Sequence, residues 1–275
     1  MSLGAHIREL WTFRDLLYNL VIRDLKVRYK NSLLGILWSL LNPLLMMLVF
    51  TFVFKVLAGN SSLEAYPAFV LSGILAWNLF SSSVMGSTNS IVGNSHLIKK
   101  VYFPRAVLPI SVVLSNLVNF LLALPVFFIL AALLGRSPTV WVVLLPAVIA
   151  VQIVFTLGVS FFLATANVFY RDTRIVMEVV ILAWFFLTPI FYPISEVGRG
   201  GMDIMGLALE GYVIQRLGRI FNPMESFIAS YRDVLYWGEP PGTDFFLRTA
   251  VTATFFLVVG FFIFLRFSRV FGEEI

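Results

Sequence analysis

Long hydrophobic stretches separated by short polar segments dominate the chain. Six stretches contain no Asp, Glu, Lys or Arg, and they cover residues 31–54, 65–98, 106–135, 137–170, 179–195 and 249–265. A helix needs about 20 residues to cross ~30 Å of hydrocarbon. Four stretches exceed that length, and the last two reach it with their flanks. The pattern predicts an all-α integral membrane protein with one transmembrane domain, residues 33–270. Its six spans are expected at 33–57, 67–90, 106–134, 140–167, 175–194 and 248–266.

The composition agrees with a membrane location. Of the 275 residues, 59% are hydrophobic and only 13% are charged, whereas a soluble domain has about 25% charged residues. The net charge of +5 does not indicate nucleic-acid binding, because the cations lie beside hydrophobic stretches and form no single basic surface. Without cysteine, the chain has neither disulfides nor thiolate-bound metals.

The first 32 residues differ from the rest and form a predicted cytoplasmic interface segment. At 100° per residue, one side of residues 6–30 carries apolar side chains, namely Leu10, Phe13, Leu17, Leu20, Val21 and Leu25. Arg14, Asp24 and Arg28 interrupt that side. The segment predicts an amphipathic helix in the plane of the membrane. The first long stretch follows this charged segment and lacks a cleavage site, so it is expected to be retained rather than removed as a signal peptide.

Residues 195–247 carry charges again and do not resemble a span. Asn222, Pro223 and Glu225 have the chemistry of a helix start: an Asn cap, Pro in the first turn and Glu three residues after the cap. A second short helix could lie at 206–220. Fifty residues are few for an independent core, so short re-entrant or interfacial outer helices are expected before the last span.

The loop cations predict the orientation. Residues 1–32 hold six Lys or Arg, the 96–105 loop holds three, and the 167–174 loop and the C-terminal tail hold two each. The short loops on the other side contain only Arg136, with Lys55 at a helix end. Under the positive-inside rule, both termini are cytoplasmic.

Sequence signatures of catalysis are missing. The chain has no Gly-Lys dipeptide and therefore no P-loop for ATP. His6 and His96 are too few for a zinc site. The span centres contain essentially no ionisable residues, which disfavours ion- or proton-coupled transport. Glu178 and Asp172 flank the fifth span and are expected to pair with Arg171 or Arg174 at the membrane edge.

Five segments resemble the permease subunits of bacterial polysaccharide-export ABC transporters. In order they are RDLKVRYKNSLLGILWSLLNPLL (23–45), LIKKVYFPR (97–105), NVFYRDTR (167–174), TPIFYPIS (188–195) and NPMESFIASYRDVLYWG (222–238). Each is a weak pattern alone, but together, in order and spacing, they cover nearly the whole chain.

This resemblance implies a half-transporter in the bacterial inner membrane. Two copies would pair around a channel, and two separate ATPase subunits, which bind ATP and Mg²⁺, would supply the energy. The implied substrate is a glycan on undecaprenyl diphosphate, such as O-antigen, teichoic acid or capsule. This chain would act without a cofactor of its own and without enzymatic chemistry.

A basic and aromatic loop is the first candidate site. Its residues are Lys99, Lys100, Val101, Tyr102, Phe103, Pro104 and Arg105, and they are expected to press into the ATPase. In the family the amphipathic helix also packs against the ATPase, so Arg23, Lys26 and Arg28 are expected to belong to the same ATPase-coupling site. The alternative is an ordinary positive-inside loop beside a helix that rests on anionic lipid.

Mid-span aromatic residues, together with Tyr231 of the outer segment, are the second candidate site, because aromatic faces stack on sugars. Those expected to contact substrate in a channel are Trp77, Phe80, Trp184, Phe185 and Tyr231. The alternative is ordinary packing. Arg171, Asp172 and Arg174 are candidates for contact with lipid phosphate or the interface, with snorkelling as the alternative.

Three rival functions stay open at this point. One is export of drugs or small lipids by the same superfamily. Another is a membrane enzyme acting on isoprenoid-linked sugars, which predicts a cluster of Asp, Glu or His at a membrane face. The third is a passive channel, against which the lack of polar pore-lining runs counts modestly.

Overall fold

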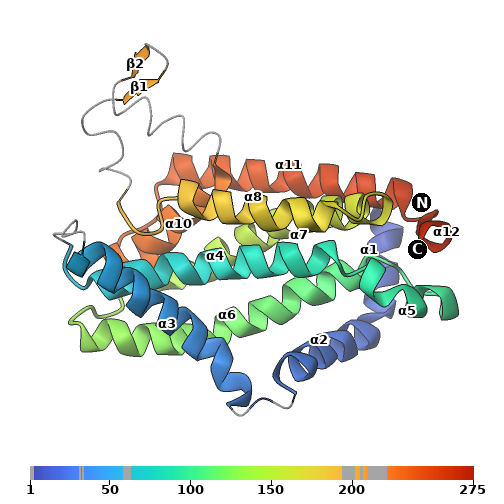
Figure 1. The fold of residues 1–275 in the computed structure, drawn as a ribbon, viewed down its shortest axis with the longest axis horizontal. Coiled ribbons are helices and arrows are strands. Elements are labelled where there is room, and N and C mark those ends of the chain that lie inside the picture. Colours follow the sequence, from blue (N-terminus) through green and yellow to red (C-terminus); the bar gives the residue numbers. More distant parts are fainter. Residues whose placement is uncertain are drawn as a thin grey trace.

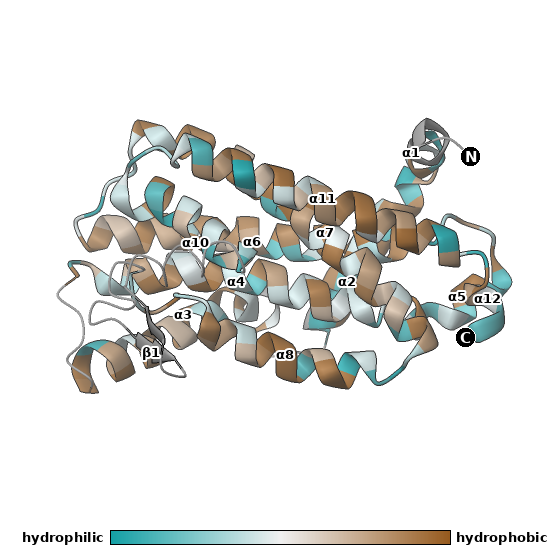
Figure 2. Ribbon diagram, turned by 90° about the horizontal axis from the view of Figure 1, so that it is seen from above, coloured by the Kyte–Doolittle hydropathy of each residue, from teal (hydrophilic) through white to brown (hydrophobic). Residues whose placement is uncertain are grey.

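The computed structural model shows an elongated bundle of long helices lying side by side, with α1 and α12 near the same end (Figure 1). We call this end the terminal end and the opposite end the outer end. The structure describes residues 3–30, 32, 34–57, 63–193, 202–204, 207–209 and 222–275. Apolar residues follow the lengths of the helices, as Figure 2 shows.

Five helical segments are long and apolar enough to cross a membrane. They are Trp38–Leu57 (α3 Trp38–Thr51 and a π-helical turn Phe52–Leu57), Tyr66–Thr88 (α4), Val107–Leu133 (α6), Val140–Phe169 (a 3-10 turn Val140–Leu144 and α7 Leu145–Phe169) and Thr243–Phe267 (α11). Predicted and observed boundaries differ by at most five residues. These five spans of the sequence analysis are therefore confirmed as candidate spans.

The fifth predicted span, 175–194, is shorter in the structure. Its helix, α8, covers Thr173–Leu187, which is about 22 Å at 1.5 Å per residue and less than the hydrocarbon thickness. The helix stops because Thr188 precedes Pro189, and a residue before proline is driven into extended backbone. α8 runs along the bundle (Figure 1) and packs against α4 and α7.

The N-terminal segment forms two helices where one was predicted. α1 (Leu3–Thr12) and α2 (Arg14–Tyr29) are separated at Phe13, whose backbone leaves the helical region with φ −95° and ψ 19°. α1 runs across the terminal end, and α2 continues obliquely along α6 (Figure 1). Leu20 and Val21, on the predicted apolar side, are buried.

The remaining described helices are short. They are η1 Gly35–Leu37, η3 Val92–Asn94, α5 Ser95–Lys100, α10 Pro223–Arg232 with a π-helical turn Asp233–Trp237, and α12 Phe271–Glu274. The Asn222 side chain accepts a hydrogen bond from the Glu225 backbone N–H, which confirms the predicted helix start.

The outer segment adds two short strands to the otherwise helical fold. Residues 202–204 and 207–209 form two antiparallel strands, β1 and β2, in which Met202 is opposite Leu209. The predicted second short helix over 206–220 is thus wrong at 207–209, where backbone pairing between strands satisfies groups that a helix would have satisfied internally. The rest of that predicted helix lies outside the described residues.

α4 is the central helix of the bundle. Of its membrane-length window, 78% is buried inside the chain, against 11% for Trp38–Leu57 and 17% for α11. The larger core cluster surrounds α4 and includes Phe69, Phe80, Phe155 and Phe227. A smaller cluster at the terminal end joins α2, the residues after α5, α11 and α12.

Two glycines let α7 and α11 approach very closely. Gly158 of α7 faces Gly260 of α11, and a Cβ atom at Gly260 would overlap the carbonyl oxygen of Gly158. Close backbone approach through small residues is a common way for membrane helices to associate. It explains why α7 and α11 make the most extensive helix pair of the bundle.

Candidate functional site

The loop after α5 presents aromatic and basic side chains at the terminal end. Val101 and Tyr102 are exposed, with 85% of Tyr102 accessible, whereas Phe103 is buried in the smaller core cluster. Lys99 and Lys100, in the last turn of α5, are also exposed. The buried Phe103 ring thus anchors the loop, and the neighbouring side chains of Val101 and Tyr102 stay exposed.

A cavity of about 620 Å³ lies between this loop, α1 and the end of α11. Arg105, Arg266 and Arg269 line it together with Glu9. Partial burial lowers the pKa of Arg105, whose guanidinium carbon lies 6.0 Å from the centre of the Phe271 ring. The excess of cations suits an acidic group of a partner.

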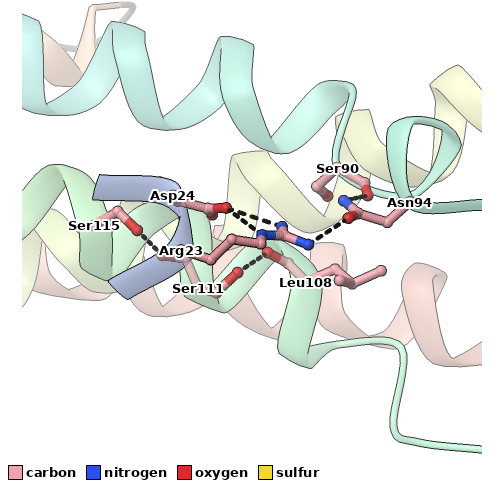
Figure 3. A network of polar contacts seen from close by, with 7 residues as sticks. All are labelled: Arg23, Asp24, Ser90, Asn94, Leu108, Ser111 and Ser115. Atoms are coloured by element: carbon pink, nitrogen blue, oxygen red, sulfur yellow. Dashed lines mark hydrogen bonds and ion pairs between the residues drawn. The ribbon is translucent and has the colours of Figure 1, made fainter. Parts of the chain in front are cut away.

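Arg23 joins α2 to the segment that leads into α5 (Figure 3). Its guanidinium donates to Asn94 Oδ1 at 3.0 Å and to Asp24 Oδ1 at 2.9 Å. Asn94 in turn donates to the Ser90 carbonyl oxygen at 2.8 Å. These hydrogen bonds would therefore transmit a displacement of α5 to α2.

Two more basic residues of α2 lie apart from this network. Lys26 is exposed. The Arg28 guanidinium donates to Asn116 Oδ1 of α6 at 3.0 Å, some distance along the bundle from α5. The structure therefore brings Arg23 to the α5 segment and directs Arg28 elsewhere.

The candidate aromatic residues come together inside the chain. Trp77, Phe80, Phe185 and Tyr231 are buried, and Trp184 is partly buried. The Trp184 ring centre lies 5.2 Å from that of Phe80 and 6.3 Å from that of Trp77. Within the single chain these side chains fill the core, as the packing alternative describes.

Tyr231 belongs to a polar chain across the core. Its hydroxyl donates to Gln152 Oε1 at 2.6 Å, and Gln152 Nε2 donates to the Ala76 carbonyl oxygen at 2.7 Å. Burial raises the pKa of the Tyr231 hydroxyl well above its ordinary value, so it stays protonated and can donate. This chain connects α10, α7 and α4.

Sequence reasoning missed the contacts that hold α10 to the end of α8. We call them the outer latch, formed by Asn222 and Arg232 with Trp184 and residues 188–190. Trp184 Nε1 donates to Asn222 Oδ1 at 2.7 Å, and Asn222 Nδ2 donates to Thr188 Oγ1 at 3.0 Å. The latch fixes the exit of α8 against the outer helix.

Arg232 is the buried cation of the outer latch. It is 5% exposed and donates to the carbonyl oxygens of Pro189, at 2.6 Å, and Ile190, at 2.5 Å. Its guanidinium carbon lies 3.6 Å from the centre of the Phe69 ring. Burial lowers the pKa of Arg232 to about 9, so it remains charged at neutral pH. Its position four residues after Ile228, on the apolar face of α10, was the one available signal in the sequence.

An ion pair predicted near the fifth span is present between Arg174 and Glu178. Arg174 Nε lies 3.5 Å from Glu178 Oε1, one helical turn further along α8. Both side chains are more than half exposed, so the pair adds little stability. Arg171 and Asp172 are exposed in the turn before α8.

Taken together, the fold defines a multi-pass membrane protein with exposed aromatic and basic side chains at its terminal end. The ABC-2 type transporter family matches residues 15–205, and the chain belongs to this family.

Curated relatives agree over nearly the whole length. The O-antigen export system permease protein RfbA of Myxococcus xanthus is 38% identical over 98% of each chain, and a Klebsiella pneumoniae protein of the same name is 34% identical over 94% of each. The polysialic acid transport protein KpsM of Escherichia coli is 21% identical over 66% of this chain and 70% of its own.

Proposed function

We propose that this chain is the membrane permease subunit of an ATP-driven exporter of a cell-envelope polysaccharide. The observation that carries the proposal is the near full-length similarity to permeases named for O-antigen export. The transport protein named for polysialic acid is a further relative with a glycan in its name. Both relationships favour a glycan over the drug or small-lipid alternative.

Energy would enter at the terminal end. An ATPase subunit, which binds ATP and Mg²⁺, would dock on Tyr102, the basic end of α5 and the arginine-lined cavity. Charge complementarity supports this, since the cavity carries three arginines and one acid among its described lining residues. The Arg23 contact to Asn94 would pass a push on α5 to α2.

We infer six crossings with both termini in the cytoplasm. α1 and α12 lie near the same end of the bundle (Figure 1), which supports an even number of crossings. α8 supplies the sixth when its extended continuation over residues 188–193 is included. The basic loops lie on the terminal end, and the positive-inside rule puts that end in the cytoplasm.

Two copies would form the working permease. α8 exposes an apolar face, with Val179 and Leu182 more than half accessible, and α3 buries little of its surface in its own chain. Such faces meet either lipid or a second copy. A channel between two copies would carry a glycan linked to undecaprenyl diphosphate, and the buried aromatic core would stiffen its wall from behind.

The test is ATP-driven glycan export by vesicles that hold this chain and its ATPase. Export should stop when the ATPase is catalytically inactive, because this chain has no P-loop of its own. Undiminished export with the inactive ATPase would refute the proposal. Turnover of lipid-linked sugar by the chain without ATP would support the membrane-enzyme alternative instead.

We call residues 99–105, which would dock the ATPase, the coupling loop. Removing its exposed side chains should uncouple the transporter. The variant Lys99→Ala/Lys100→Ala/Tyr102→Ala is expected to weaken ATPase binding at least tenfold, because one exposed aromatic and two charges contribute about 1–3 kcal/mol to such an interface. Co-purification and ATPase stimulation measure this. Trp141→Ala, an exposed aromatic at the outer end, is the matched control and should bind normally. Equal binding by all three proteins would argue against this docking surface.

A further inference from the structure

A polar cavity of about 420 Å³ lies between α2, α3, α4 and α6, away from the coupling loop. We call it the asparagine cavity. Its polar lining consists of Asn42, Asn78, Asn116, Asn119, Ser39 and Ser82, with Arg28 of α2 as the only charged residue among the described lining residues. The proposed function gives it no role.

Most of the amide side chains in the candidate spans line this cavity. The five candidate spans contain six Asn or Gln residues in all, and four of these line the cavity. Gln152, one of the other two, has both ends of its amide paired in the core. Three different spans thus bring their polar side chains to one place.

Membrane energetics makes this arrangement costly unless a polar partner fills it. Burying an unpaired amide or hydroxyl in an apolar medium costs roughly 2–7 kcal/mol. The side chains of Asn42 and Ser82 are nevertheless exposed at the surface of the chain, within membrane-length helices. Among the described residues, the side-chain amides of Asn42 and Asn78 form no hydrogen bond. Polar side chains placed in this way within spans mark ligand or ion pathways.

Depth in the bundle and charge narrow the class of ligand. Asn78 lies ten residues before the terminal end of α4, about 15 Å along the helix. Arg28, at the end of α2, is exposed and held at the cavity by its bond to Asn116. One cation therefore meets the ligand at one side, and neutral amides and hydroxyls meet it elsewhere.

This combination matches a phosphate beside hydroxyl groups. Arginine pairs well with phosphate, and an amide can donate to one hydroxyl while accepting from another. A free metal cation fits poorly, because no described Asp or Glu lines the cavity. A purely apolar ligand would leave the amides of Asn42 and Asn78 without a hydrogen-bond partner.

We propose that the asparagine cavity binds the phosphate-bearing, hydroxyl-rich headgroup of a membrane lipid from the leaflet next to α1 and α2. Two sources have this chemistry: a sugar-diphosphate lipid, which would be the exporter's own cargo, and phosphatidylglycerol of the bulk bilayer. The first source rests on the proposed function, and the second does not.

Native mass spectrometry of the full-length chain in neutral detergent tests the proposal. The probes are undecaprenyl diphosphate carrying one N-acetylglucosamine, phosphatidylglycerol, and phosphatidylcholine, which has a phosphate but no headgroup hydroxyl. Asn42→Leu, Asn78→Leu and Arg28→Gln should each weaken binding of a hydroxyl-bearing probe by about tenfold, the effect of losing one or two hydrogen bonds. Thr254→Leu, an exposed polar residue of α11 outside the cavity, is the matched control.

The outcomes separate the two sources. A loss confined to the sugar-diphosphate lipid identifies the cargo, and an equal loss for phosphatidylglycerol identifies a bulk-lipid site. Unchanged binding by the three cavity variants, or equally tight binding of phosphatidylcholine, overturns the proposal. Asn→Leu removes a polar group from a span, so these variants should fold, and a melting curve checks this. ATP-dependent export is scored separately, so the proposed function can stand if the cavity fails.

Discussion

Arg232→Leu is expected to destabilise the protein by about 3 kcal/mol, a large effect for one side chain. The substitution leaves the carbonyl oxygens of Pro189 and Ile190 without their donor in a buried site. It also removes the cation that lies over the Phe69 ring. A clear fall in the melting temperature in detergent, with loss of the fixed position of residues 188–190, is the measurable result.

Two further variants show whether geometry or charge is responsible. Arg232→Lys keeps the charge but not the planar fork that reaches both carbonyls, so it should lie between the native protein and Arg232→Leu. Arg248→Leu removes a cation 5.5 Å from the Phe245 ring at an exposed site, and should change stability little. If Arg248→Leu melts as low as Arg232→Leu, the outer latch does not have the stabilising role assigned to it.

Sequence reasoning placed the spans well because their signal is long and simple. A run of more than 20 residues without charge can hardly be anything else, and α4, α6 and α7 begin and end near the predicted residues. The end of α8 was predicted too late, since a charge-free run says where a segment is apolar and not where it stops being helical. The position of Pro189 indicates where the helix ends.

Sequence reasoning could not tell the inner from the outer faces of the spans. A helix that is apolar all round has no periodicity to read, so Trp77 and Phe80 could be placed in a channel wall or in a core. The structure buries both. Which face of a span is buried depends on which helices surround α4, and that is a property of the whole bundle.

The polar features that matter most come from residues far apart in the chain. Arg232 finds its acceptors more than 40 residues away, and Asn42 shares a cavity with Asn119 across two intervening loops. An isolated Asn or Arg in the sequence carries no sign of such partners. By contrast, an interaction between residues close together in the sequence could be predicted, as the helix cap at Asn222 shows.

Gly260→Val is expected to be more damaging than any exposed substitution in the spans. A Cβ atom at this position would overlap the carbonyl oxygen of Gly158, and one at Gly158 would overlap the backbone of Phe256 and Leu257. Backbone cannot rotate away as a side chain can, so α7 and α11 must separate. Overpacking of this kind costs 1–3 kcal/mol and occasionally more, and here it acts on the most extensive helix pair of the bundle.

The measurement is the yield of monodisperse protein and its melting temperature in detergent. Gly260→Val should show a loss of about 3 kcal/mol or more, and Gly260→Ala a smaller loss in the same direction, because both must move the same carbonyl. Gly242→Ala is the matched control at the start of α11, where a new Cβ would meet only the Phe245 side chain at an ordinary 3.7 Å. It should leave stability within about 0.5 kcal/mol. Native-like melting of Gly260→Val would mean that α7 and α11 do not meet backbone to backbone, and the packing of the last span would then have to be redrawn.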